Sequence, residues 1–142
     1  MPTYDACISI AAPRESVWRA LAAVAHWPEW LPTVSSVQPL DGDPLKIGAR
    51  YTVRQPKLRP ATWVVTELKP LQFFVWEARS AGLLMIASHT IEEIPTGGSR
   101  VTLGFAFAGP LGAPLGWLFR SITERYLAQE LASLKMKAEE QR

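Results

Sequence analysis

Alternating apolar and polar residues along most of the chain predict a series of short β-strands. Residues 4–11 have the alternation of an opening strand, and residues 34–40 have a strand-like composition. Further candidate strands, rich in Val, Thr, Phe and Trp, follow at 49–55, 62–68, 72–79, 83–93 and 100–108. Turn residues such as Thr96-Gly97-Gly98-Ser99 separate them. Because the connections are short, we expect antiparallel pairing and a sheet of about seven strands.

Helical periodicity occurs in two parts of the chain. Apolar residues recur at helical spacing after Pro13, which predicts a short helix over residues 13–24. Residues 26–32 contain two prolines, which permit at most one more helical turn. From Leu115 to Glu139 one face is formed by residues spaced three and four apart, namely Leu118, Phe119, Ile122, Tyr126, Glu130 and Leu134. This last helix is at least about 30 Å long.

The order of these elements predicts an α+β fold in which the sheet curls around the last helix. A sheet with one apolar face must cover that face, and the last helix is the only large one available. Residues 73–76 and 83–86 are apolar on both faces of their strands. This surplus fits either a lined cavity between sheet and helix or a dimer contact.

Several short segments resemble the START-like (SRPBCC) superfamily, in particular its polyketide cyclase/dehydrase branch. The resemblance is carried by residues 10–18 (IAAPRESVW), Trp27-Pro28-Glu29-Trp30, Gly48, Trp63, Trp76-Glu77 and His89. It spans nearly the whole chain and implies a helix-grip fold, with residues 1–142 forming one START-like ligand-binding domain. It further implies a deep cavity between the sheet and the last helix, opening near the Gly/Pro-rich start of that helix. No universal catalytic residue accompanies the resemblance.

Composition and charge remove several function classes. The net charge is +2 and the basic residues are scattered, which argues against a nucleic-acid-binding stripe. Cys7 is the single cysteine, so an intrachain disulfide and a cysteine-rich zinc site are impossible, and its apolar context predicts burial. No signal peptide and no apolar run of about 20 residues is present, so we expect no integral membrane association and a cytoplasmic protein. We expect no metal and no cofactor.

The predicted inner faces of the strands and of the last helix supply the candidate ligand-binding residues. Tyr51, Trp63 and Tyr126 combine an aromatic body with a polar tip, which suits ring-bearing or hydroxylated ligands. The full set is Tyr51, Val53, Trp63, Val65, Trp76, Met85, His89, Phe105, Leu118, Phe119, Ile122 and Tyr126.

Three polar residues are candidates for catalysis, each with a structural alternative. His89 shares its strand parity with apolar residues and could act as an acid or base, or be a hydrogen-bonded core histidine. Glu77 could point inward and pair with Arg50 or Arg54, or form a cross-strand pair on the surface. Tyr126 is the third candidate. Glu130 lies on the apolar stripe of the last helix, where we expect a salt bridge with Arg19 or Lys135.

These patterns favour the binding or transport of a small hydrophobic or aromatic ligand, such as a lipid, polyketide or isoprenoid-like molecule. A cyclase/aromatase-type enzyme acting in the same cavity is the main alternative. A dimeric interaction or regulatory module, using Trp117 and Phe119 at the start of the last helix, is the second alternative.

Overall fold

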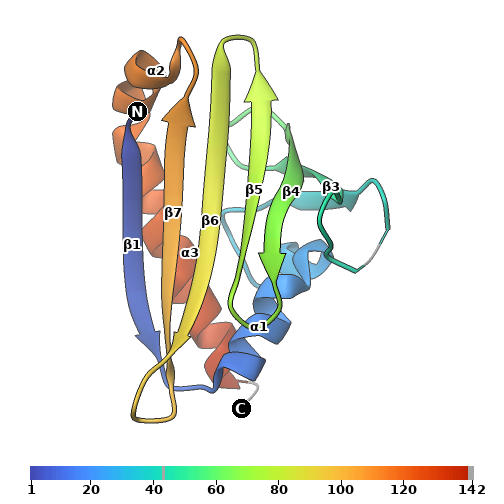
Figure 1. Ribbon diagram of the computed structural model, residues 1–142, viewed down its shortest axis with the longest axis vertical. Coiled ribbons are helices and arrows are strands. Elements are labelled where there is room, and N and C mark those ends of the chain that lie inside the picture. The colour runs from blue at the N-terminus through green and yellow to red at the C-terminus, as the bar shows by residue number, and fades with distance from the viewer. Residues whose placement is uncertain (43, 141–142) are drawn as a thin grey trace.

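An antiparallel sheet and a long C-terminal helix packed across it form the two layers of the protein (Figure 1). The computed structural model describes residues 1–42 and 44–140. The strands are β1 (Thr3–Ile10), β2 (Ser36–Pro39), β3 (Arg50–Arg54), β4 (Ala61–Lys69), β5 (Phe73–Ser80), β6 (Leu83–Glu93) and β7 (Ser99–Ala108). The helices are α1 (Arg14–Ala22), the 3₁₀ helix η1 (Val24–Glu29), α2 (Gly112–Leu118) and α3 (Arg120–Glu140). The sheet order is β1-β7-β6-β5-β4-β3-β2, so the chain closes by placing β7 beside β1.

The pairing register brings the buried residues of neighbouring strands onto one face of the sheet. Trp76 of β5 lies opposite Ala87 of β6 and Val65 of β4, and Ala87 lies opposite Phe105 of β7. Alternate residues point to opposite faces of a strand, so these side chains share the inner face that α3 covers. The burial pattern of β5 follows this alternation, since Phe74, Trp76 and Ala78 are buried and their neighbours are not.

Curvature of the sheet makes room for α3 and for a space beside it. The register between β4 and β5 shifts between Val65 and Glu67, and such a bulge bends the strand and increases its twist. The strands β3 and β2 consequently turn away from the plane of β1, β7 and β6 (Figure 1). The helix α1 lies at the end of the sheet where α3 ends (Figure 1), and η1 follows it directly in the chain. There the indole nitrogen of Trp27 donates a hydrogen bond to the carbonyl of Leu21 (3.0 Å).

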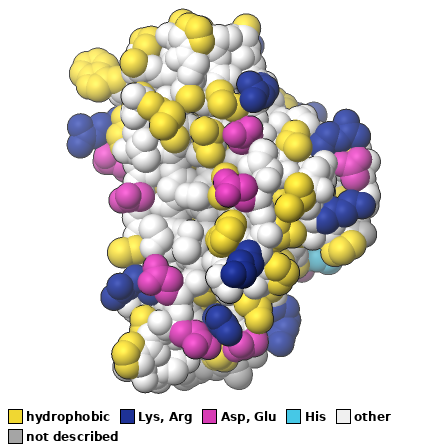
Figure 2. Space-filling view, in the orientation of Figure 1, with side chains coloured by type: hydrophobic (Ala, Val, Ile, Leu, Met, Phe, Trp, Pro, Cys, Tyr) yellow, Lys and Arg dark blue, Asp and Glu magenta, His cyan; other side chains and the backbone are white. Residues whose placement is uncertain are grey.

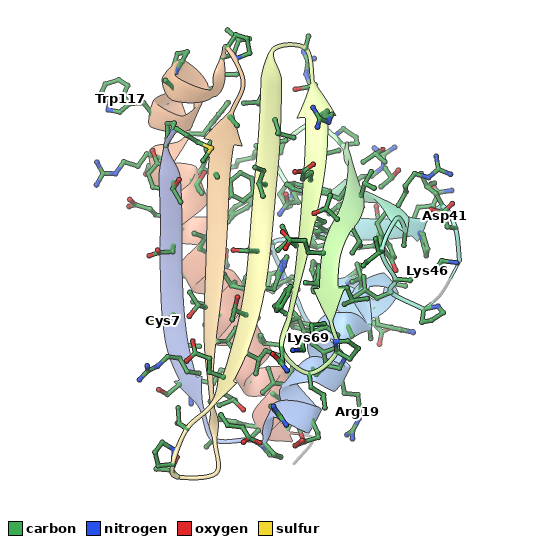
Figure 3. All side chains as sticks on the ribbon, in the orientation of Figure 1. Cys7, Arg19, Asp41, Lys46, Lys69 and Trp117 are labelled. Carbon is green, nitrogen blue, oxygen red and sulfur yellow. The ribbon has the colours of Figure 1, made fainter. Side chains whose placement is uncertain are left out.

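The α+β helix-grip fold expected from the sequence is confirmed, with three corrections. The chain becomes helical at Gly112, earlier than the predicted Leu115, because Pro114 is tolerated in a first helical turn. A break at Phe119 then separates α2 from α3. Cys7 is exposed and not buried, because it lies on the outer face of β1 (Figure 3).

The surface has no large region of one charge on the face turned to the viewer in Figure 2, where acidic and basic side chains are interspersed over the sheet. Hydrophobic side chains gather at the end of the molecule that carries α2 (Figure 2). Trp117 is 77% exposed and points away from the sheet (Figure 3).

Candidate functional site

A cavity of about 400 Å³ lies between the inner face of the sheet and α3. Its size is within the range of small-molecule sites. The wall is mainly aromatic and aliphatic, with contributions from Trp27, Val34, Val53, Ala61, Trp63, Trp76, Leu83, Met85, Ala87, Phe105, Phe107, Phe119 and Ile122. The polar lining residues are Gln55, Lys57, Arg59, His89, Thr123, Tyr126 and Glu130.

One end of the cavity meets solvent and the other ends in the core. Exposed lining residues Lys57, Leu58 and Arg59 come from the β3–β4 loop and mark the mouth. The far end is formed by buried Trp27 and Val34, beside η1. The lining residues of the C-terminal helical segment run from Phe119, between α2 and α3, to Glu130, a rise of about 16 Å at 1.5 Å per residue.

His89 is held in the wall by its neighbours and is neutral at physiological pH. Its ring stacks on Phe74, with centroids 4.0 Å apart, and Nδ1 lies 3.2 Å from the carbonyl oxygen of Phe74. Since that oxygen can only accept, Nδ1 carries the hydrogen and Nε2 is the free acceptor. Burial lowers the pKa of His89 from 6.5 to about 4, although the bond to Phe74 opposes the shift.

Glu130 places a carboxyl group in the same wall. Desolvation raises the pKa of Glu130 from 4.5 to about 7, and the hydrogen bond donated by Thr33 Oγ1 to Oε1 (3.5 Å) opposes the rise only weakly. A large fraction of the protein therefore holds a protonated carboxyl here at neutral pH, able to donate a hydrogen bond to a ligand oxygen. The expected salt bridge with Arg19 or Lys135 is wrong, because Lys135 bonds Glu139 and the Ser9 carbonyl, and Arg19 is exposed.

Tyr126 closes one side of the mouth. Its hydroxyl donates a 2.6 Å hydrogen bond to the carbonyl of Pro56 in the β3–β4 loop. This bond ties α3 to the loop, so the hydroxyl positions the rim of the cavity.

The structure places most of the expected ligand-binding residues in the cavity wall. These are Val53, Trp63, Trp76, Met85, His89, Phe105, Phe119, Ile122 and Tyr126. Tyr51 and Val65 face the same side of the sheet but are packed into the core, with 0% and 1% exposure. Leu118 is 67% exposed on α2 and does not line the cavity, because the break at Phe119 changes the helical phase assumed for it.

Glu77 lies outside the cavity. It alternates with inward Trp76 and Ala78 and is nearest to Arg79, at 3.9 Å, while Arg50 pairs with Asp41. The inward orientation with a partner at Arg50 is therefore wrong for Glu77.

The lining residues that sequence patterns did not single out include Ala61, Leu83, Ala87 and Phe107 of the strands and Thr123 of α3, besides residues of irregular segments. The stretch Gln55–Arg59 and Val34 belong to connections whose contacts no periodicity reveals. The signal that could have found Glu130 was present, since an acidic residue on an apolar helical stripe is unusual.

No group of three or more His, Cys, Asp or Glu side chains suited to a metal ion occurs within residues 1–42 and 44–140. In the same described part of the chain, no helix is both long and apolar enough to cross a membrane.

Comparison with solved structures shows the same fold in proteins of low sequence identity. The Zhui aromatase/cyclase from Streptomyces sp. R1128 has a TM-score of 0.79 and 15% identity, over 96% of this chain and 93% of that one. The di-domain ARO/CYC BexL from the BE-7585A biosynthetic pathway has a TM-score of 0.75 and 22% identity, over 98% of this chain and 47% of that one. Ara h 8.0201 has a TM-score of 0.66 and 12% identity, over 93% and 96%.

No curated protein sequence matches the chain. Residues 1–139 match the family described as "Polyketide cyclase / dehydrase and lipid transport". The match covers the strands, the helices and every residue of the cavity wall. The chain therefore belongs to the polyketide cyclase/dehydrase and lipid transport family.

Proposed function

We propose that the protein binds a small, largely apolar, ring-containing molecule in the cavity between the sheet and α3. The observation that carries this proposal is the cavity of about 400 Å³, walled by Trp27, Trp63, Trp76 and Phe105 and open to solvent at one end. Burying apolar ligand surface there contributes about 25 cal/mol per Å² before the costs of association. The protonated carboxyl of Glu130 and the acceptor nitrogen of His89 would orient a ligand that carries oxygen.

A matched pair of variants tests binding inside the cavity. Ala87 lies in the wall between Trp76 and Phe105, so Ala87→Leu fills part of the space. Ala106 alternates with Phe105 and Phe107 and lies on the outer face of β7, so Ala106→Leu adds the same atoms outside. Cavity filling of this kind leaves stability unchanged or raises it by about 0.5–2 kcal/mol.

The assay is native mass spectrometry of freshly purified protein, followed by denaturing extraction and by titration with the neutral dye N-phenyl-1-naphthylamine. We expect a bound apolar molecule or saturable dye binding in wild type and Ala106→Leu, and at least a tenfold loss in Ala87→Leu. An empty wild-type protein that also fails to bind the dye would overturn the proposal, as would equal binding by both variants.

Catalysis in the same cavity is the second candidate function, favoured by the neutral carboxyl of Glu130 and the neutral imidazole of His89 in one apolar wall. In a dehydration of a β-hydroxy ketone, His89 Nε2 takes the proton from the carbon next to the carbonyl. Glu130 gives its proton to the departing hydroxyl, which leaves as water, and the electron pair of the broken C–H bond forms the carbon–carbon double bond. Proton return from His89 to Glu130, directly or through water, restores both groups.

The catalytic candidate is tested with 4-hydroxy-4-phenylbutan-2-one, by following the absorbance of the enone product. We expect wild type to accelerate the reaction and Glu130→Gln to lower the rate at least a hundredfold while dye binding persists. Equal rates in wild type, Glu130→Gln and buffer would remove the enzyme alternative and leave the carrier function.

The predicted homodimer rests on exposed apolar residues of α2. Trp117 and Leu118 are 77% and 67% exposed, whereas Phe119 lies in the cavity wall and is not available to a partner. Sedimentation of wild type and Trp117→Ser at high concentration tests the dimer, and a monomer in both cases contradicts it.

A further inference from the structure

The cavity mouth carries two basic side chains, which the binding of a purely apolar ligand would not require. Lys57 and Arg59 both line the cavity and both are exposed, on either side of Leu58. Among residues 1–42 and 44–140, neither takes part in an ion pair. Two basic side chains at a mouth create a positive potential that attracts anions and that low-dielectric walls strengthen.

The loop that carries these cations is held in one place. Tyr126 of α3 bonds the carbonyl of Pro56, and the backbone NH of Leu58 donates to the carbonyl of Gln55 (3.2 Å). Lys57 itself has a φ of 66°, in the left-handed region that non-glycine residues seldom occupy. A strained conformation fixed by contacts on both sides is a feature found at ligand-holding loops. The backbone that carries the two cations is therefore held beside the mouth.

One helical turn further in from the mouth, the wall has the reverse character. Glu130 follows Tyr126 by one helical turn, about 6 Å further along α3 and away from the mouth. A ligand anion placed there would face a carboxyl group and lose water without gaining a cation, which is costly. The lining polarity thus changes from cationic at the mouth, through an apolar middle, to a hydrogen-bonding carboxyl inside.

We propose that the ligand is a small amphipathic acid, whose apolar ring-containing body fills the cavity and whose single anionic group lies at the mouth between Lys57 and Arg59. This proposal rests on the proposed ligand-binding function and names the chemical class of its ligand. The anionic group is a carboxylate or a phosphate monoester, since both accept hydrogen bonds from Lys and Arg.

The test uses competitors that share one ring system and differ in charge. N-phenyl-1-naphthylamine serves as the neutral reporter, and 2-naphthoate, 2-naphthyl phosphate and 2-naphthamide compete with it at low salt. We expect at least one of the two acids to displace the dye at a concentration about three- to tenfold lower than the amide, as two exposed charge contacts allow. The stronger of the two acids identifies the anionic group.

Two double variants locate the effect. Lys57→Gln with Arg59→Gln removes the mouth cations. The advantage of the acids over the amide, each measured against the variant's own affinity for the dye, should then fall to about twofold or less. Lys69→Gln with Arg100→Gln removes the same charge from exposed positions at the other end of the sheet, and the advantage should persist. Lys69 is seen there, at the end of β4, in Figure 3. Raising the salt to 0.5 M should also abolish the advantage.

Equal displacement by acids and amide in wild type would overturn the amphipathic-acid proposal, and so would an advantage that survives loss of Lys57 and Arg59. Both results leave the cavity function standing, because the dye is still bound. Failure of the dye to bind at all contradicts the proposed function itself, so the two failures are distinguishable.

Discussion

Glu130→Gln should make the protein more stable at alkaline pH and have little effect at acidic pH. Burial raises the pKa of Glu130 from 4.5 to about 7, so the fold prefers the protonated carboxyl. Below pH 4.5 the group is protonated in both folded and unfolded chains, so it makes no contribution to the pH dependence of the unfolding free energy. As the pH rises, the unfolded chain loses this proton first. The free energy of unfolding then falls, because the folded state must either keep the proton or bury the charge.

The size of the effect follows from the two pKa values. A shift from 4.5 to about 7 corresponds to about 3 kcal/mol when both states are ionised. Between pH 5 and pH 8 the penalty should grow by about 2–3 kcal/mol, less what solvent reaching the cavity screens. His89 also adds a slope in this window, because its pKa is 6.5 when unfolded and about 4 when folded, so the unfolded chain gains a proton as the pH falls. That contribution is the same in both proteins and cancels in the difference between them.

The assay is urea unfolding of wild type and Glu130→Gln at pH 5, 6, 7 and 8. The difference in unfolding free energy between them should increase steadily in favour of the variant. Glu67→Gln, which removes an exposed carboxyl from β4, is the matched control. Its unfolding free energy should change with pH in the same way as that of wild type. A difference between Glu130→Gln and wild type that does not change with pH would refute the reasoning.

Three further substitutions probe the core, the rim and the entry into α1. Phe74→Ala should cost about 3–5 kcal/mol in urea unfolding, because Phe74 is fully buried and stacked on His89; a loss below about 1 kcal/mol contradicts this packing. Tyr126→Phe should speed amide hydrogen exchange in residues 55–60 with a global loss of about 1 kcal/mol or less, and unchanged exchange there would show that the bond to Pro56 does not hold the loop. Ser99→Ala should cost about 1–3 kcal/mol in urea unfolding, because it orphans the buried Ala12 carbonyl that accepts from the Ser99 hydroxyl at 2.8 Å; a neutral result contradicts it.

The inner face of the sheet was predictable because strand parity is a local property. Trp63, Trp76, Met85 and Phe105 were expected on the inner faces of their strands, in the cavity that the family resemblance implies, and all four line it. Parity could not orient Glu77, because a bulge of one residue reverses the face of everything beyond it. The register of the neighbouring strands was needed to put Glu77 outside.

Predicting which helical residues line the cavity required the rotational phase of the helix and contacts between residues far apart in the sequence. Leu118 was assigned to the cavity by assuming one helix through Phe119, and the break there leaves it exposed. Glu130 was expected at a surface salt bridge, because the sequence does not reveal that the turn after η1 brings Thr33 against α3. The cavity opening was expected near the Gly/Pro-rich start of the last helix, and the part of the β3–β4 loop in it was not predicted, since the contact between Pro56 and Tyr126 joins residues 70 positions apart.

The central claim, that a small apolar molecule enters the cavity, is tested most directly by the indole NH signals of the six tryptophans in a ¹⁵N-labelled sample. Titration with N-phenyl-1-naphthylamine should shift the signals of Trp27, Trp63 and Trp76, which line the cavity, and leave that of exposed Trp117 in place. Assignment by single Trp→Phe variants identifies each signal. A titration that shifts Trp117 and leaves the three wall tryptophans unchanged would contradict the account, because the ligand would then bind outside, on α2.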